Sequence, residues 1–336
     1  MKGHLEIPLP ESGDRLLFVR FSSLGDVLLA LRKAKALKTK FPGLNLTWLS
    51  QVEYEGLLRT QSYVDDVLAW DIRKGRLTII PLIRQVRNRN FRFLYSVHHN
   101  DRSALVSAFS GIPARVGYHK NLQFAYDYSL VEASKAWHLD ESRDGASALE
   151  VPETGRSGVR QKLPCGMNRV LFCAIGASKK FKRWPARSWS VFLSEASRMG
   201  LKPVLVGDGA EEERMAGEII STCPFDVVDM VGKLSLEEVA ALASLSELAI
   251  GGDTGPIHLA RMTGIPCIGL FAVRNPSRYG HKGKNLVAFV SKSPYDVYPE
   301  WVPDSCPLES IEPGSVAIEM EKLLKEGQIR PFSCKA

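Results

Sequence analysis

The sequence predicts an α/β fold made of two doubly wound domains, each built around a mostly parallel sheet. Over residues 16–117, short apolar runs alternate with amphipathic helical segments, which is the pattern of βαβ units. The alternation stops over residues 140–166, a polar stretch rich in Gly, Ser and Pro with no clear period. It resumes over residues 169–271. We therefore interpret the polar stretch as a linker between two domains of similar size.

The predicted elements of the first half follow one another along the chain. Residues 16–20 form a buried strand, and 26–40 form a helix that is ended by Phe41-Pro42-Gly43, because Pro and Gly commonly follow a helix C-terminus. The further predicted strands are 44–49, 66–70, 91–97 and 114–117, and the further helices are 52–59, 77–89 and 103–110.

The second half repeats the pattern. Its predicted strands are 169–175, 203–206, 226–231, 248–250 and 267–271, and its helices are 188–198, 210–222, 236–245 and 256–263. A last amphipathic helix, 315–325, could pack back across the molecule. We expect domains at 1–160 and 161–315, then a C-terminal helix and tail at 316–336 that could pack on the first domain. Paired α/β domains usually bind ligands in the cleft between them, at the carboxyl ends of their strands.

Composition narrows the class of protein. The 336 residues are 45% hydrophobic and 24% charged, enough to bury a large core. No apolar run approaches the roughly 20 residues that span a bilayer, and residues 1–15 lack the apolar region of a secretory signal. The six cysteines are scattered without a Cys-x-x-Cys pair, so we expect reduced thiols and a cytoplasmic protein.

The chain is basic, with a formal net charge of +7 and basic clusters at 73–92 and 179–187. Such clusters are either solvated helix faces or surfaces for nucleotide phosphates, anionic lipid or nucleic acid. The sequence has no recognised nucleic-acid-binding motif and no alternation of aromatic and basic residues, so we expect no nucleic-acid partner.

The strongest motif is Gly251–Ala260, "GGDTGPIHLA". Asp253, Thr254 and Gly255 form a turn after a strand, and Pro256 suits the first position of a helix. The N-terminus of that helix would present free N–H groups to an anion, with His258 near its first turn. The alternative is a plain helix-capping box with a buried histidine.

Two further strand–loop–helix corners carry charged residues. In "GASKKFKRWPARSW", Ser178, Lys182 and the neighbouring basic residues suit a diphosphate, although the P-loop spacing is absent and the alternative is a solvated basic loop. In "GDGAEEERMAG", one of Glu211, Glu212 and Glu213 could accept hydrogen bonds from ribose hydroxyls. The alternative is that these acids merely complement the helix dipole.

The first corner, "FVRFSSLGDVLLA", has one glycine where a dinucleotide site would have three. Asp26 is its only carboxylate, and it is either an acid of the first helical turn or a general base facing the cleft. The chain has no Asp-x-Asp motif and no Cys/His cluster, and the adjacent His98 and His99 point to alternate faces. We therefore expect no metal site.

Together these motifs resemble glycosyltransferase family 9, the ADP-heptose:lipopolysaccharide heptosyltransferases, over nearly the whole chain. The resemblance is carried by Ser22, Ser23, Gly25 and Asp26, by Lys182-Arg183-Trp184-Pro185, by the segment 209–214, and by Asp253-Thr254-Gly255-Pro256 with His258, Leu259 and Ala260.

The resemblance implies a GT-B architecture, in which two Rossmann-like doubly wound domains face a central cleft. It implies an inverting transfer of heptose from ADP-heptose to a lipid-linked inner-core (lipid A–Kdo) acceptor of lipopolysaccharide, without a metal or other cofactor. The first domain would take the acceptor and the second the sugar nucleotide. A cytoplasmic enzyme is implied, peripheral to the anionic inner face of the inner membrane.

The resemblance also implies roles for single residues. Asp26 would be the catalytic base, with Ser22, Ser23 and Gly25 in an acceptor-side loop. On the donor side, Lys182 would bind the diphosphate and act in catalysis, Glu211 would bind the ribose, and Leu234 would pack on the adenine. The rest of the donor site would be Ser178, Asp253, Thr254, Gly255 and His258.

The chain departs from the family pattern in two places. Many members carry an Asp-Leu-Gln-Gly-like segment where this chain reads Ser96-Val97-His98-His99-Asn100, which concerns the acceptor side. The loop 294–303, "PYDVYPEWVP", matches no family motif.

Two other functions are open on this fold. One is transfer of another nucleotide sugar or to another glycan acceptor, and the other is non-catalytic binding of a nucleotide sugar or glycan, against which the presence of Asp26 argues. A dehydrogenase is disfavoured because neither Rossmann corner carries Gly-x-Gly-x-x-Gly.

Overall fold

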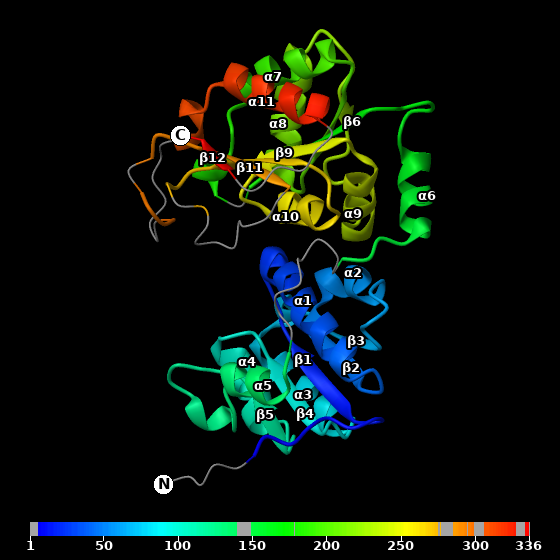
Figure 1. Ribbon diagram of the computed structural model, residues 1–336, viewed down its shortest axis with the longest axis vertical. Coiled ribbons are helices and arrows are strands. Elements are labelled where there is room, and N and C mark those ends of the chain that lie inside the picture. The colour runs from blue at the N-terminus through cyan, green and yellow to red at the C-terminus, as the bar shows by residue number, and fades with distance from the viewer. Residues whose placement is uncertain are drawn as a thin grey trace. The chain divides into compact units, whose positions relative to one another are not determined.

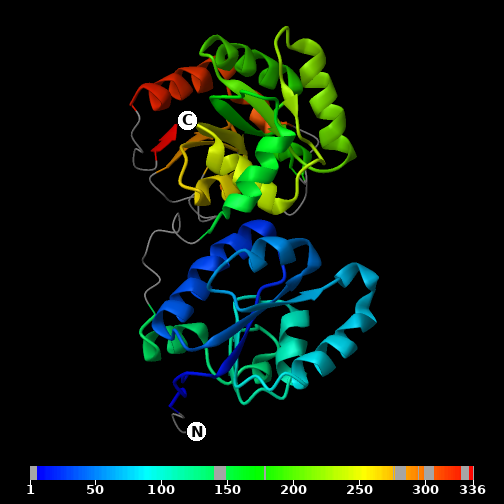
Figure 2. The same ribbon diagram turned by 90° about the vertical axis from the view of Figure 1, so that its right-hand side faces the viewer.

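The computed structural model describes residues 6–139, 149–177, 179–274, 276, 285–293, 295–298, 306–326 and 333–335. The chain divides into two compact units, Met1–Glu150 and Val151–Ala336. Each unit is a parallel sheet flanked by helices, which confirms the predicted α/β class with two parallel sheets (Figures 1 and 2). None of the helices in these ranges combines the length and the apolarity that crossing a bilayer requires.

The first unit has a five-stranded sheet in the order β3-β2-β1-β4-β5, with every pair parallel. Its strands are β1 (Arg15–Val19), β2 (Asn45–Gln51), β3 (Asp66–Trp70), β4 (Phe93–Ser96) and β5 (Ala114–Val116). Its helices are α1 (Leu24–Lys40), α2 (Glu55–Arg59), α3 (Ile79–Arg87), α4 (Asp101–Phe109) and α5 (Leu130–Ala136). The strand order reverses between β1 and β4, which is where open α/β sheets bind ligands.

The second unit has a sheet in the order β12-β11-β10-β9-β6-β7-β8, again parallel throughout. Its strands are β6 (Val170–Ala174), β7 (Lys202–Val206), β8 (Val228–Asp229), β9 (Leu248–Gly252), β10 (Cys267–Phe271), β11 (Leu286–Val290) and β12 (Ser333–Lys335). Its helices are α6 (Glu153–Lys162), α7 (Ala186–Arg198), α8 (Ala210–Thr222), α9 (Leu236–Leu245), α10 (Gly255–Met262) and α11 (Pro313–Glu326). Here the order reverses between β6 and β9.

The C-terminal helix α11 packs against α7 within the second unit (Figure 1). Val316 and Met320 join the core that Trp189 and Phe192 of α7 form over the sheet. Trp184 is buried in the same core, and its Nε1 donates to the carbonyl of Ile311 at 3.2 Å. The sequence had allowed for packing of this helix on the first domain; the packing observed is on α7.

Four of the α-helices and β-strands given above were not predicted from the sequence. Helix α6 lies in the stretch interpreted as a linker, and it buries only Val159, so no apolar period reveals it. Contacts of Lys162 Nζ with Glu238 (2.7 Å) and Arg156 Nε with Ser244 (3.2 Å) attach it to α9. The predicted boundary after residue 160 therefore falls inside a helix of the second unit. The others are α5, β11 and β12. Residues 140–148 of the linker lie outside the described ranges.

Candidate active site

In the corner after β1, contacts to one carboxylate oxygen, Oδ2, hold the side chain of Asp26 in place. Ser23, the N-cap of α1, donates to Asp26 Oδ2 from its backbone N (3.2 Å) and its Oγ (3.0 Å). Arg20 pairs with the same oxygen at 2.5 Å, and its other terminal nitrogen donates to the carbonyl of Val97 at 2.7 Å. Within the described part of the chain Oδ1 makes no hydrogen bond or ion pair, and the side chain is 48% exposed. The carboxylate is thus held in place with one oxygen open to accept a proton.

The rest of the corner is small and polar, as predicted. Ser22 is half-buried ahead of the N-cap, and Gly25 lies in the first turn of α1. The sequence had left two interpretations of Asp26, first-turn acid or general base. The structure has Asp26 in the capping box of α1, and the open Oδ1 leaves the base role available.

His98 and His99 follow β4 beside this corner and differ in burial and in their contacts. His98 is buried with its ring 5.0 Å from that of Phe21, and burial together with the Arg20 guanidinium lowers the pKa of His98 to about 4. His99 is exposed, and its Nδ1 donates to the carbonyl of Tyr118 at 3.2 Å. The two rings therefore contact different residues.

A third histidine that sequence reasoning missed lies nearby. His119 Nδ1 accepts from the backbone N of Asn121 (3.2 Å) and Leu122 (3.0 Å), and its Nε2 is 3.0 Å from Asp101 Oδ1. The ring therefore ties the loop after β5 to the first residue of α4. No sequence motif indicated this residue, because its partners come from its own loop and from a separate helix.

In the second unit, the structure brings together Lys182, Asp253 and His258. Lys182 Nζ lies 2.8 Å from Asp253 Oδ2, and His258 Nε2 lies 3.3 Å from Asp253 Oδ1. Lys182 and Asp253 are 71 positions apart in sequence, and both side chains are largely buried. The cluster lies at the carboxyl end of β9 beside β6, where the strand order reverses.

The turn between β9 and α10 has the features of an anion site. Thr254 is the N-cap of α10, Gly255 is its first residue, and Pro256 stands in its first turn. The first N–H groups of a helix have no intrahelical acceptor and point toward such a turn. Gly252 allows close approach of the chain, because a Cβ there would lie 2.6 Å from the carbonyl oxygen of Lys182.

Tyr298 completes this cluster and was not predicted. Its ring centroid lies 3.6 Å from Lys182 Nζ, and its ring packs 5.8 Å from that of Phe181. It belongs to the loop 294–303 that matched no motif, of which residues 295–298 are described. An aromatic side chain in a loop belongs to no helix or strand period, so the sequence did not indicate its position.

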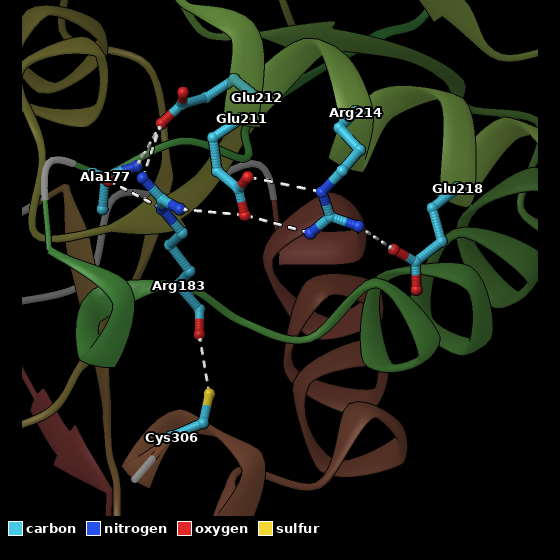
Figure 3. Close-up of polar contacts among 7 residues, drawn as sticks. All are labelled: Ala177, Arg183, Glu211, Glu212, Arg214, Glu218 and Cys306. Carbon is cyan, nitrogen blue, oxygen red and sulfur yellow. Dashed lines mark hydrogen bonds and ion pairs between the residues drawn. The ribbon is translucent and has the colours of Figure 1, made fainter. Parts of the chain in front are cut away.

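Arg183 joins the loop after β6 to the start of α8 (Figure 3). Its Nε donates to the carbonyl of Ala177 at 2.8 Å, and its terminal nitrogens lie 3.4 Å from Glu211 Oε1 and 3.5 Å from Glu212 Oε1. Glu212 Oε1 also accepts from the backbone N of Ala177 at 3.2 Å. The loop after β6 and the N-terminus of α8 are therefore clamped together by one side chain.

The two glutamates differ in burial. Glu211 is 47% exposed, and its hydrogen bond to Arg214 holds the pKa of its carboxyl below the usual range. Glu212 is 11% exposed and lies over Gly176 and Gly207 at the ends of β6 and β7. A Cβ on Gly176 would lie 2.6 Å from Glu212 Cγ, so glycine makes room for this carboxylate. Glu212 is thus a second candidate beside the predicted Glu211.

The other predicted donor-site residues are less constrained. Leu234 is half-buried in the turn after β8, directly before Ser235, the N-cap of α9. Ser178 lies outside the described residues. Among the residues that are described, no group of three or more His, Cys, Asp and Glu side chains is arranged to hold a metal ion.

Comparison with known proteins places this chain among sugar-transferring enzymes. The model of glycosyltransferase family 9 (heptosyltransferase) matches residues 79–300. The lipopolysaccharide core heptosyltransferase OpsX of Haemophilus influenzae is 23% identical over an alignment that covers 96% of this chain and 95% of the relative.

Two solved structures resemble the chain over nearly the whole of both molecules. The glycosyl transferase family 9 protein from Veillonella parvula has a TM-score of 0.82 at 20% identity and covers 96% of this chain and 99% of its own. The E. coli heptosyltransferase WaaC with ADP-2-deoxy-2-fluoro heptose has a TM-score of 0.72 at 18% identity, covering 92% and 99%. This likeness confirms the predicted GT-B fold of two Rossmann-like units.

Proposed function

Because the chain belongs to glycosyltransferase family 9, the heptosyltransferases, we propose that it transfers heptose from ADP-heptose to an inner-core (lipid A–Kdo) acceptor of lipopolysaccharide. The observation that carries the proposal is the Lys182–Asp253–His258 cluster beside the N-terminus of α10, on a chain that matches the family model over residues 79–300. Relatives support the substrates: one is named a lipopolysaccharide core heptosyltransferase, and another is solved with a fluorinated ADP-heptose.

On the donor side, the proposed mechanism needs positive charge at the diphosphate. Lys182 supplies a cation, and the N–H groups at Thr254 and Gly255 supply a helix N-terminus, so developing charge on the leaving ADP meets fixed donors. Loss of one such donor often costs about 2.7–4 kcal/mol of transition-state stabilisation. We assign no metal or other cofactor a role in this step.

The remaining contacts to the donor are assigned from the resemblance to the family motifs. Asp253 and His258 complete the loop at the diphosphate, and Leu234 packs on the adenine. Glu211 or Glu212 binds the ribose hydroxyls. Ser178 is assigned to the donor site on the same grounds.

On the acceptor side, Asp26 is the proposed base. The acceptor hydroxyl attacks the anomeric carbon opposite the diphosphate, Asp26 takes the hydroxyl proton, and the bond to the diphosphate breaks to release ADP. Anomeric configuration is inverted by this single displacement. Arg20 and Ser23 hold Oδ2 and leave Oδ1 open for the proton. The first unit would thus serve the acceptor and the second unit the donor.

The lipid-linked acceptor also requires the protein to work at a membrane surface, which we propose is the cytoplasmic face of the inner membrane. The turn before α3 and its outer face expose Leu77 (78%) and Ile80 (48%), and the side chains of Arg73, Lys74, Arg84 and Arg87 are exposed with them. No Asp or Glu occurs over residues 72–92. An apolar face framed by cations suits an anionic lipid surface.

The test of the proposed function is a donor–acceptor screen with product mass measurement. ADP-heptose with a lipid A–Kdo acceptor should give a product heavier by one heptose, whereas UDP-sugars should give none. Calorimetry should find that ADP-heptose binds more tightly than UDP-sugars do. A product from another nucleotide sugar would favour a different transferase, and donor binding without any product would favour a non-catalytic module.

Asp26→Asn should lower turnover by about 10²–10⁴-fold, because the amide cannot take the proton, while donor binding is retained. Turnover and calorimetric titration with ADP measure the two effects. Glu132→Gln is the matched control, since Glu132 closes a capping box on α5 just as Asp26 does on α1. Wild-type turnover of Asp26→Asn would show that the base has been misassigned.

A further inference from the structure

We propose that Tyr298 is a positioning residue that holds Lys182 ready for the donor diphosphate, an inference that rests on the proposed function. Neither the sequence motifs nor the family resemblance involves this tyrosine. The observation is the ring of Tyr298 against the Lys182 ammonium, with 3.6 Å between Nζ and the ring centroid.

Lys182 is held from two directions. Asp253 Oδ2 lies 2.8 Å from Nζ, and the aromatic ring covers a second side of the ammonium group. A lysine ammonium has three N–H donors on a flexible four-carbon stem, so it loses much conformational freedom when it must adopt one geometry. Two restraints fix the group in advance and leave part of its donor capacity for a ligand.

The two restraints differ in what they do to the charge. Asp253 carries a negative charge, which repels an incoming diphosphate as it attracts the lysine. The tyrosine ring attracts a cation through its quadrupole without carrying a net charge, and the attraction strengthens where water is excluded. Lys182 is largely buried, so the ring can hold the ammonium while its charge stays available to phosphate.

The segment that carries Tyr298 is itself anchored to the sheet. The backbone N of Arg274, after β10, donates to the carbonyl of Tyr295 at 2.9 Å, and Arg274 Nε lies 3.4 Å from Asp296 Oδ1. Tyr295 N donates to Ser293 Oγ, after β11, at 3.2 Å. The Tyr298 ring also packs on the buried Phe181, next to Lys182 in sequence. Its position is therefore set by two strand ends.

The test compares Tyr298→Leu, which removes the ring, with Tyr298→Phe, which keeps it. Calorimetry with ADP should find about 2- to 30-fold weaker binding for Tyr298→Leu, and binding within about twofold of wild type for Tyr298→Phe. The donor KM should rise by a similar factor with little change in kcat. In a Lys182→Ala background, Tyr298→Leu should change ADP binding by less than about twofold, because the ring acts through the lysine.

A second readout does not depend on any ligand. A ring this close shifts the NMR signals of the Lys182 ε-methylene upfield in the ligand-free protein. That shift should persist in Tyr298→Phe and disappear in Tyr298→Leu. Loss of the signal in Lys182→Ala assigns it, and unchanged melting temperatures show that the variants are folded.

The outcomes separate this inference from the proposed function. Wild-type ADP affinity in Tyr298→Leu, with weakened binding in Lys182→Ala, would overturn the positioning role alone. So would an equal loss from Tyr298→Leu with and without Lys182, or an ε-methylene shift that survives Tyr298→Leu. Failure of the wild type to bind ADP or ADP-heptose would overturn the proposed function and this inference with it.

Discussion

At the scale of single residues, Asp26 Oδ2 accepts from Ser23 and pairs with Arg20, while Oδ1 is left open. The contacts that cap α1 thus also orient the carboxylate. A base that is fixed by its structural contacts needs little reorganisation when the acceptor arrives. The capping and catalytic interpretations of this residue are therefore compatible.

The two glutamates at the start of α8 can be separated by experiment. We expect Glu212→Gln to weaken ADP binding more than Glu211→Gln, by about 10-fold or more, because the charge-assisted hydrogen bond that a ribose hydroxyl donates to the buried carboxylate is lost. Calorimetry with ADP measures this, and inorganic pyrophosphate, which lacks ribose, is the control ligand. If only Glu211→Gln weakened ADP binding, the ribose contact would belong to Glu211, the residue that the family motif indicates.

His98 should make the stability of the first unit depend on pH. Its pKa is lowered to about 4 by burial and by Arg20, whereas an unfolded histidine titrates near 6.5. The unfolded state therefore binds more protons between these values, and roughly 2–4 kcal/mol of stability present above pH 6.5 is lost as pH falls toward 4. Denaturant unfolding over this range measures the slope, which should flatten in His98→Gln. An equal slope in both proteins would contradict this account.

At the scale of elements, strands and helices that bury a regular apolar face were predicted within a few residues of their observed bounds, with the exception of the buried strand β11, which was missed. β3, α8, α9 and β10 have the predicted ends. The missed helices bury few side chains: α6 buries Val159 and α5 buries Ala133. Their formation is decided by contacts with distant helices or by capping, as with Ser129 and Glu132 on α5, and periodicity does not report either.

The exposed face of α3 should bind anionic vesicles. Replacing both Leu77 and Ile80 by Glu should lower co-sedimentation with vesicles containing anionic lipid by about 10-fold or more, because apolar burial is lost and the added negative charges are repelled by the lipid. Val131→Glu, on the exposed side of α5 in the same unit, is the matched control. Equal binding of wild type and the double variant would exclude α3 as the docking surface.

At the scale of the whole molecule, the proposed base and the proposed diphosphate ligand belong to different units, Met1–Glu150 and Val151–Ala336. Substitutions in one unit should therefore leave the local structure of the other intact. The proposal that the first unit binds the acceptor and the second unit the donor can be tested by measuring which variants change donor binding.

ADP should stabilise the protein through the second unit. At an ADP concentration of 100 times the dissociation constant, the free energy of unfolding of the second unit should rise by about 2.7 kcal/mol. Lys182→Ala, with affinity weakened about 10-fold, should gain only about 1.4 kcal/mol at the same concentration. Denaturant unfolding with and without ADP measures both. Asp26→Asn should gain as much as the wild type, and a reduced gain there would contradict the separation of roles.

The sequence by itself determined the alternating strands and helices, the two parallel sheets and the family motifs, because these depend on local periodicity and on short runs of residues. It also indicated that Lys182 and Asp253 belong to one site. Only the tertiary structure decided that they meet at 2.8 Å, that Tyr298 covers the ammonium, and that Glu212 rather than Glu211 lies over the glycines that follow β6 and β7. Those contacts join residues far apart in sequence, and only the folding of the strand ends onto one edge brings them together.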